Sequence, residues 1–175
     1  MATLPHIPLA EYLDTIYRPD REYIDGEVRE RNVGLWPHSR LLFLLGGHLG
    51  AHESLWNITA CMSPRLQVSP TRIRVPDLVL MRPGPQPEIL TDPPLLILEI
   101  LSPDDTYSDL QERCQDYRAM GVEYIWIIDP KTRSGRMCRG PSWIAADRLE
   151  IPGTPIHVNL PHLFQQIDSS STVSS

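Results

Sequence analysis

The chain has 175 residues, of which 41% are hydrophobic and 22% charged, proportions that are ordinary for a soluble globular protein. Its formal net charge of -6 argues against a broadly basic nucleic-acid-binding protein, although it is compatible with a local basic groove. Because no apolar run approaches the roughly 20 residues that span a bilayer and no signal peptide is visible at the N-terminus, we expect a cytoplasmic protein with no membrane segment.

The first half of the chain predicts helices and short strands in alternation. An amphipathic pattern predicts a short helix over residues 9–17. An Asp-Gly pair supplies the positive φ angles of a tight turn, so residues 22–29 predict a β-hairpin. A proline then opens a predicted helix over residues 37–52, with leucines along one face. Short strands are expected near residues 57–62, 65–68 and 77–81.

The most apolar stretch of the chain carries an acidic residue in its middle. Residues 94–101 read Pro-Leu-Leu-Ile-Leu-Glu-Ile-Leu, which predicts a strand buried on both faces. An ionised carboxylate there is costly unless it is paired or holds a metal ion, so Glu99 requires an explanation. Asp77 lies in similar apolar surroundings upstream. Two carboxylates on neighbouring interior strands are the arrangement that a site for a divalent cation requires.

A β-α-β unit follows this strand. Ser102, with a proline and two aspartates after it, predicts a helix start, and Gly121 is a suitable residue to end that helix. Residues 124–128 predict a second buried strand, and this spacing indicates a right-handed parallel crossover. Closing strands are expected near residues 135–138, 143–146 and 157–158. We therefore expect one α/β domain over residues 1–167 and a disordered serine-rich tail over residues 168–175.

Both acids also have a purely structural interpretation. Asp77 could be a residue at the start of a strand that bonds to a turn. Glu99 could form a buried ion pair with Arg113, which lies at the border of the predicted helix face toward the sheet. The sequence leaves these alternatives open.

The order of these pieces resembles the Uma-two family, restriction-type endonucleases of the PD-(D/E)XK nuclease superfamily. The most specific motifs are a Pro-Asp pair ending at Asp77, a buried strand that contains Glu99 and ends in Leu-Ser-Pro, and a helix with Tyr117 followed by Gly-Val-Glu-Tyr-Ile-Trp-Ile-Ile-Asp-Pro. The hairpin that begins with Glu22 and the position of His38 also fit the family pattern. The resemblance covers about residues 8–165.

This resemblance implies a restriction-endonuclease-like fold: a four-stranded mixed central sheet flanked by helices, with additional β-hairpins. It also implies a DNA endonuclease that binds Mg²⁺ or Mn²⁺ through Asp77 and Glu99, with the backbone carbonyl of Ile100 facing the same space. A homodimer is expected from the family, with apolar loops around Trp36 and Trp56 as a possible interface.

One departure from the family pattern affects the chemistry. Where the superfamily motif has lysine, two residues after Glu99, this chain has Leu101; the family moves the basic role to the following helix, and alignment places Arg113 there. Arginine stays charged and cannot act as a base, so Arg113 could only orient water or stabilise the phosphate.

The remaining candidates for a supporting role near the metal are Glu22, His38 and Tyr117. For Glu22 the alternative is an ordinary surface strand residue, for His38 a local turn residue, and for Tyr117 a core aromatic. The competing function is a catalytically weakened or inactive protein of the same fold that binds DNA or another protein. A nuclease should direct Asp77 and Glu99 toward solvent or an ion, whereas a relic should bury Glu99 against an arginine.

Overall fold

The computed structural model describes residues 6–31, 34–139 and 142–169. The helices are α1 (Leu9–Asp14), α2 (Trp36–Ala51), α3 (Glu53–Trp56), α4 (Tyr107–Met120) and α5 (Leu160–Ser169). The strands are β1 (Arg21–Ile24), β2 (Glu27–Glu30), β3 (Thr59–Met62), β4 (Leu66–Ser69), β5 (Arg72–Arg74), β6 (Leu78–Met81), β7 (Leu96–Ile100), β8 (Tyr124–Asp129), β9 (Ser134–Arg139), β10 (Ser142–Ala145), β11 (Arg148–Glu150) and β12 (His157–Asn159).

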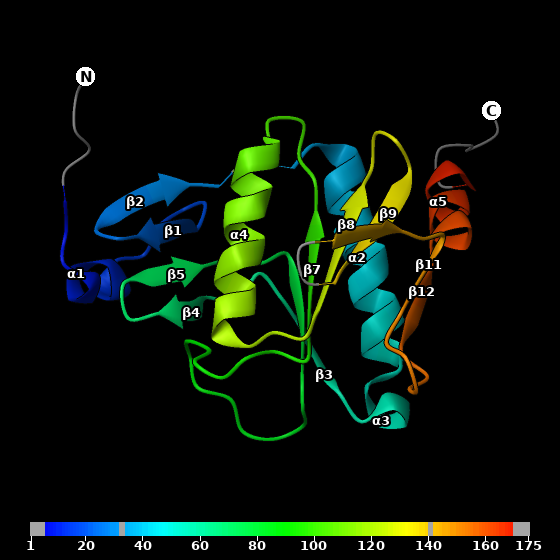
Figure 1. Ribbon diagram of the computed structural model, residues 1–175, viewed down its shortest axis with the longest axis horizontal. Coiled ribbons are helices and arrows are strands. Elements are labelled where there is room, and N and C mark those ends of the chain that lie inside the picture. The colour runs from blue at the N-terminus through cyan, green and yellow to red at the C-terminus, as the bar shows by residue number, and fades with distance from the viewer. Residues whose placement is uncertain (1–5, 32–33, 140–141, 170–175) are drawn as a thin grey trace.

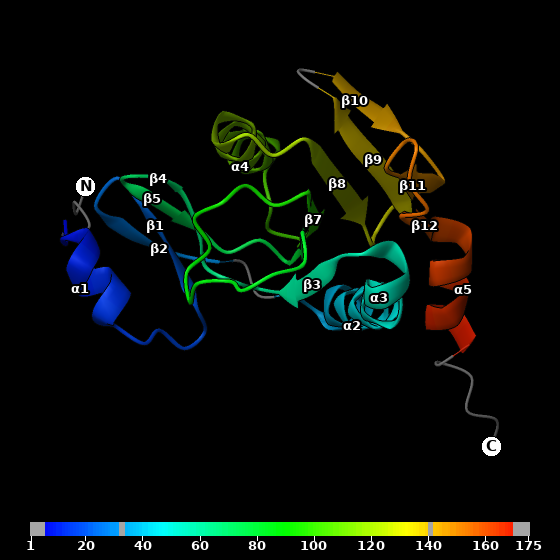
Figure 2. The ribbon, with the colours of Figure 1, turned by 90° about the horizontal axis from the view of Figure 1, so that it is seen from below.

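A six-stranded mixed sheet forms the centre of the fold, with helix α4 on one face and helix α2 on the other (Figures 1 and 2). The strand order is β10-β9-β8-β7-β6-β3, and only β7 and β8 run parallel within it. Helix α4 joins these two strands, which confirms the predicted parallel crossover. The expected sheet of four strands is too small, because β3 and β10 add one strand at each edge.

The two faces of this sheet pack into separate apolar clusters because the side chains of a strand alternate between faces. Leucines of α2 pack against Leu78, Leu98 and neighbouring residues on one face. Leu110, Cys114 and Tyr117 of α4 pack against the other. All of strands β6 and β7 is buried, as expected for strands covered on both sides. In the part of the chain that the structure describes, no helix is long and apolar enough to cross a membrane.

A smaller sheet of order β2-β1-β5-β4 lies beside the central sheet (Figure 2). It contains the predicted hairpin, whose turn residues Asp25 and Gly26 have φ angles of 51° and 97°. Helix α1 covers this sheet through the fully buried ring of Tyr12 and ends three residues earlier than expected. Strand β5 was not predicted, because three residues between turns give no clear alternation.

The start of α4 differs from the prediction. Its N-cap is Thr106, not Ser102. The Thr106 hydroxyl accepts a hydrogen bond from the Asp109 N–H at 3.1 Å, and the Asp109 carboxylate accepts one from the Thr106 N–H at 3.3 Å, which together form a capping box. The helix ends as predicted at Gly121, whose φ of 105° favours glycine.

The C-terminal part adds the hairpin of β11 and β12 and the amphipathic helix α5. Neither β11 nor α5 was predicted. Helix α5 buries Leu163 and Phe164 and continues to Ser169, two residues into the expected tail. Asp168 in this helix pairs with Arg133 at 2.8 Å. Residues 170–175 of the expected tail lie outside the described residues.

Candidate active site

Asp77 and Glu99 lie side by side at one end of the central sheet. Strands β6 and β7 are antiparallel and pair Leu78 with Leu98, so the next residue on each strand brings the two acids together. Both are buried, with 2% and 1% of their surface exposed. The carboxylate of Asp77 accepts a hydrogen bond from the Ile100 N–H at 2.8 Å, which ties the first acid to the strand that carries the second.

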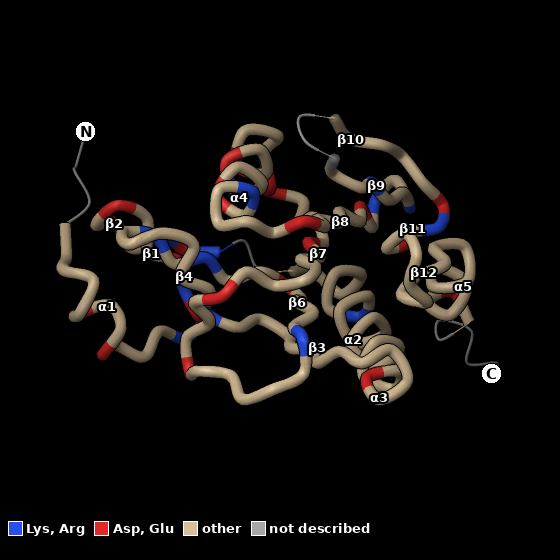
Figure 3. The backbone as a smooth tube through the Cα atoms, turned by 60° about the horizontal axis from the view of Figure 1, so that its bottom comes forward, with Lys and Arg blue, Asp and Glu red and all other residues tan. Residues whose placement is uncertain are grey.

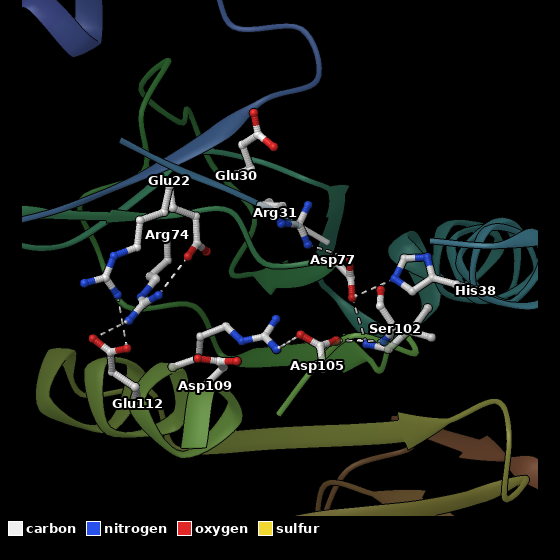
Figure 4. A pocket seen from close by; sticks show the side chains of 13 residues that line it. Glu22, Glu30, Arg31, His38, Arg74, Asp77, Ser102, Asp105, Asp109 and Glu112 are labelled. Atoms are coloured by element: carbon white, nitrogen blue, oxygen red, sulfur yellow. Dashed lines mark hydrogen bonds and ion pairs between the residues drawn. The ribbon is translucent and has the colours of Figure 1, made fainter. Parts of the chain in front are cut away.

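Asp77 is held by donors from several parts of the chain (Figure 4). Its Oδ1 accepts a hydrogen bond from Nη2 of Arg31 at 2.7 Å, and its Oδ2 lies 3.3 Å from Nε2 of His38. Burial alone would raise the pKa of this carboxyl group, but the hydrogen bond from His38 and the positive charge of Arg31 hold the pKa below its usual value. Asp77 is therefore ionised at neutral pH.

Glu99 has the opposite electrostatic character. Its Oε1 accepts a hydrogen bond from the hydroxyl of Tyr117 at 2.5 Å, and its Oε2 accepts one from Nη1 of Arg113 at 3.2 Å. Complete burial raises the pKa of Glu99 to about 7; the charge of Arg113 opposes this rise and that of Asp77 adds to it. Two adjacent acids whose pKa values diverge in this way are characteristic of functional sites.

Arg113 lies where the sequence predicted it, at the carboxylate pair. Its second terminal nitrogen, Nη2, donates to Oδ1 of Asp105 at 2.6 Å, so the guanidinium bridges Glu99 and the loop between β7 and α4. Burial would lower the pKa of Arg113, but Glu99 and Asp105 raise it above its usual value, so the residue stays charged. It cannot accept a proton at this position.

A cavity of about 170 Å³ opens over Asp77. Among the described residues that line it, the arginines are Arg29, Arg31, Arg74 and Arg113, and the acids are Glu22, Glu30, Asp77, Asp105, Asp109 and Glu112. Glu99 is almost fully buried and is not one of these lining residues, but it is bonded to Arg113, which is. Acids therefore outnumber arginines around this cavity.

The donor types at this site fit a hard divalent cation. Mg²⁺ and Mn²⁺ prefer carboxylate and carbonyl oxygens, which Asp77, Glu99 and the Ile100 carbonyl supply. The N–H and C=O of one strand residue point toward the same neighbouring strand; since the Ile100 N–H points to Asp77, its carbonyl is directed to the same side. In the structure, Arg31 and Arg113 supply the positive charge that balances the two acids. Within the described ranges, no group of three or more His, Cys, Asp or Glu side chains is arranged to hold a metal ion.

Glu22 lies in the wall of the cavity and is not a surface residue, because only 7% of it is exposed. It accepts hydrogen bonds from Nη1 of Arg74 at 2.7 Å and from the Val75 N–H at 3.1 Å. Val75 precedes Asp77 by two residues. Glu22 thus holds the segment that carries Asp77 and has no contact of its own with Glu99 among these hydrogen bonds.

Ion pairs join the small sheet to α4, and Figure 3 shows basic positions on that sheet and acidic positions on the helix. Arg74 and Arg72 both reach Asp116 of α4, at 2.6 Å and 2.9 Å. Arg29 of the hairpin lies 3.4 Å from Glu112 on the same helix. These contacts fix the hairpin, and with it Arg31, over the end of the central sheet.

The sequence reasoning missed Arg31 and Arg74. Arg74 lies in strand β5 and Arg31 directly follows β2, and the position of this sheet relative to Asp77 has no signature in the local sequence pattern. The only local signal is compositional: the basic residues number 16, and all except Lys131 are arginines, the residue best suited to buried ion pairs. Lys131 follows β8, where its N–H donates to Asp129 at 2.8 Å.

A family model described as "Putative restriction endonuclease", that of the Uma-two family, matches residues 9–165 of the chain. The chain belongs to the Uma-two family. A crystal structure from Anabaena variabilis ATCC 29413, described as "a putative nuclease belonging to DUF820", has the same fold: the TM-score is 0.79, and the alignment covers 91% of this chain and 98% of the other at 20% identity. No curated protein matches this Uma-two chain. Family and fold together indicate a restriction-endonuclease-like nuclease.

Proposed function

We propose that this Uma-two protein is an endonuclease that depends on a divalent cation and hydrolyses DNA phosphodiester bonds. The observation that carries the proposal is the placement of Asp77, directly before β6, beside Glu99 of β7, with Asp77 lining a cavity open to solvent. Family membership and fold support the nuclease class. The cation and the DNA substrate are inferred from the chemistry of the donors.

In this proposal Asp77, Glu99 and the Ile100 carbonyl hold Mg²⁺ or Mn²⁺. A cation held there would supply positive charge to a phosphoryl oxygen and lower the pKa of the attacking water. Arg113 keeps Glu99 oriented and places a permanent positive charge beside the reacting phosphate, where negative charge increases in the transition state. Tyr117 fixes the other oxygen of Glu99, and His38 fixes Asp77.

The charge of the cavity supports a requirement for a cation. The acids that line it outnumber the arginines, and Glu99, which does not line it, is bonded to the lining residue Arg113. Such a cavity repels the phosphates of DNA unless additional positive charge is bound. A divalent cation on Asp77 and Glu99 would supply that charge at the place where the acids are concentrated.

A plasmid-nicking assay tests this function. We expect the wild-type protein to nick supercoiled plasmid with Mg²⁺ or Mn²⁺ and to be silent in EDTA. Asp77→Asn and Glu99→Gln should each lower the rate by about 100-fold or more, because several kcal/mol of transition-state stabilisation are lost. Glu30→Gln is the matched control, because Glu30 lines the same cavity but pairs with Arg21 at its rim. Nicking that persists in EDTA, or in both site variants, would contradict the proposal.

The second candidate function is a DNA-binding protein of the same fold without catalysis. It is favoured by one observation: Glu99 is 1% exposed and is bonded to Arg113 and Tyr117, the buried ion pair expected of a relic. In that case DNA should shift in a gel without being cleaved, and Glu99→Gln should leave the affinity for DNA unchanged.

We also propose a homodimer, as family membership suggests, in the cytoplasm, where the DNA substrate would be present. Trp56 cannot supply the interface, because it is 8% exposed and belongs to the core. Trp36, the other residue expected at the interface, begins helix α2 and is 67% exposed, and with Phe43, which is 64% exposed, it offers an apolar surface. Sedimentation should show a dimer at micromolar concentration, and Trp36→Ser combined with Phe43→Ser should shift it toward the monomer.

A further inference from the structure

Arg31 reaches the candidate site from outside the central sheet. It follows directly after β2, at the end of the hairpin, and its Nη2 donates to Oδ1 of Asp77 at 2.7 Å across 46 residues of chain (Figure 4). Only 20% of the Arg31 side chain and 3% of the Asp77 side chain are exposed. The ion pair is therefore shielded from water, and its geometry is set by the hairpin.

The two oxygens of Asp77 are not equally available to a cation. Oδ2 already accepts a hydrogen bond from the Ile100 N–H at 2.8 Å and lies 3.3 Å from His38. Oδ1 is the oxygen that remains for a ligand from the cavity, and Arg31 holds it. A guanidinium and a divalent cation on one buried oxygen repel each other strongly, because the local dielectric constant is low. Occupation of Oδ1 by one excludes the other.

If a cation displaces Arg31 from Asp77, the guanidinium needs a second binding partner, and arginine can bind either a carboxylate or a phosphate. Its planar donors match a carboxylate or a phosphate equally well, and it stays charged in either. Arg31 also lines the cavity in which the scissile phosphate would lie. Its backbone is held nearby because the hairpin is anchored to β5 and α4 through pairing of β1 with β5 and through Arg29 and Glu112.

We propose that Arg31 exchanges partners. It neutralises Asp77 in the cation-free protein, leaves Oδ1 when a divalent cation binds, and then binds a phosphate of the DNA substrate. This inference rests on the proposed function. It makes Arg31 an internal competitor of the cation and a substrate-binding residue of the cation-loaded protein.

The first test measures Mn²⁺ binding by isothermal titration calorimetry without DNA. Arg31→Met should bind Mn²⁺ at least about tenfold more tightly than wild type, the factor that corresponds to about 1.4 kcal/mol. Arg29→Met is the matched control: it removes the same charge from the same hairpin and cavity, but Arg29 pairs with Glu27 and Glu112. We expect it to change the affinity by about threefold at most, as for a screened surface charge. Arg31→Gln, which keeps a donor for Asp77, should act in the same direction if Arg31→Met does not fold.

The second test measures binding of a DNA oligonucleotide with and without Ca²⁺, which is used in place of Mn²⁺ to avoid cleavage. Arg31→Met should weaken binding by about tenfold when Ca²⁺ is present, as expected for one lost charge-assisted contact, and should have little effect in EDTA, where Asp77 retains Arg31. Arg29→Met should have the same effect in both conditions.

The possible outcomes separate the two proposals. If wild type, Arg31→Met and Arg31→Gln bind Mn²⁺ with equal affinity, Arg31 does not compete with the cation. If Arg31→Met weakens DNA binding equally in Ca²⁺ and in EDTA, Arg31 does not change partners when the cation binds. Both results leave the nuclease proposal intact if plasmid is nicked. If Mn²⁺ binds none of these proteins, the competition and the cation requirement are both wrong. A third outcome is that Arg31→Met binds Mn²⁺ more tightly and weakens DNA binding only with the cation, while no plasmid is nicked. This outcome supports the exchange of partners and contradicts only the hydrolytic function.

Discussion

Arg113 and Tyr117, one helical turn apart on α4, together hold the carboxylate of Glu99, with Arg113 on Oε2 at 3.2 Å and Tyr117 on Oε1 at 2.5 Å. Residues four apart lie on the same face of a helix, so a single helix surface orients the acid. Because α4 is also the crossover between β7 and β8, the helix that completes the sheet is the element that positions its buried acid.

Arg113→Lys should increase nicking activity. A lysine ammonium desolvated beside Glu99 can lose its proton and assist deprotonation of water, whereas arginine cannot. We expect a rise of about tenfold, a modest part of the range known for general base catalysis. The measurement is the nicking rate with Mg²⁺, and Arg133→Lys, in an exposed pair with Asp168, is the control. A rate for Arg113→Lys tenfold below wild type would show that the planar guanidinium itself is needed.

Stability in EDTA should decrease as the pH rises from about 4.5 to about 7. The pKa of Glu99 is raised by burial from 4.5 to about 7, so within this window the folded protein binds a proton that the unfolded chain has lost. The contribution of Glu99 to the free energy of unfolding is therefore fully present below about pH 4.5 and lost above about pH 7. Urea unfolding at several pH values should show this slope in wild type. Glu99→Gln should flatten the slope, and an unchanged slope would mean that Glu99 is ionised throughout.

Glu22→Ala should destabilise the fold by about 3–5 kcal/mol, the typical cost of removing one partner of a buried ion pair. The variant leaves the Val75 N–H and one side of Arg74 without their acceptor. Glu30→Ala on the same hairpin is the control, because its side chain is 74% exposed and such pairs contribute about 1 kcal/mol or less. Chemical denaturation measures both. If the two variants cost the same, Glu22 does not anchor the Asp77 segment.

Thr106→Ala should cost about 1 kcal/mol, because it removes the side chain that caps α4. Ser102→Ala should cost less, since the hydrogen bond of Ser102 to Asp105 uses its backbone N–H at 2.7 Å and survives the substitution. Thr106→Ser keeps the cap and should be nearly neutral. The free energy of unfolding is measured for all three. A larger loss for Ser102→Ala than for Thr106→Ala would restore the helix start that the sequence pattern suggested.

Local patterns in the sequence were sufficient for the elements that present the two acids. The apolar run around Glu99, the crossover spacing and the glycine at the end of α4 identified β7, α4 and β8, because burial on both faces and helix termination are decided by neighbouring residues. The angular position of Arg113 on its helix placed it beside Glu99 for the same reason. Side chains of a strand alternate between faces, so Asp77 and Glu99 lie on the same faces as Val79 and Ile97, which pack in the cluster with α4.

Apart from Arg113, only the tertiary structure decided which charges surround those acids. Arg31 and Asp77 are 46 residues apart, and Glu22 and Arg74 are 52 apart. Both contacts depend on how the hairpin sheet is placed against the central sheet. This placement arises from packing between complete helices and strands, including the packing of Tyr12 of α1 against Tyr23 and Ile73 of the hairpin sheet. The helix cap shows the same limit at short range: the sequence pattern indicated a helix start at Ser102, whereas the capping box of Thr106 and Asp109 begins the helix four residues later. The sequence therefore determined that Asp77 and Glu99 lie in buried segments and that Arg113 faces Glu99, because strand and helix periodicity are local. The fold determined that the two acids lie side by side and that Arg31 neutralises Asp77, because strand pairing and long-range ion pairs leave no periodic trace.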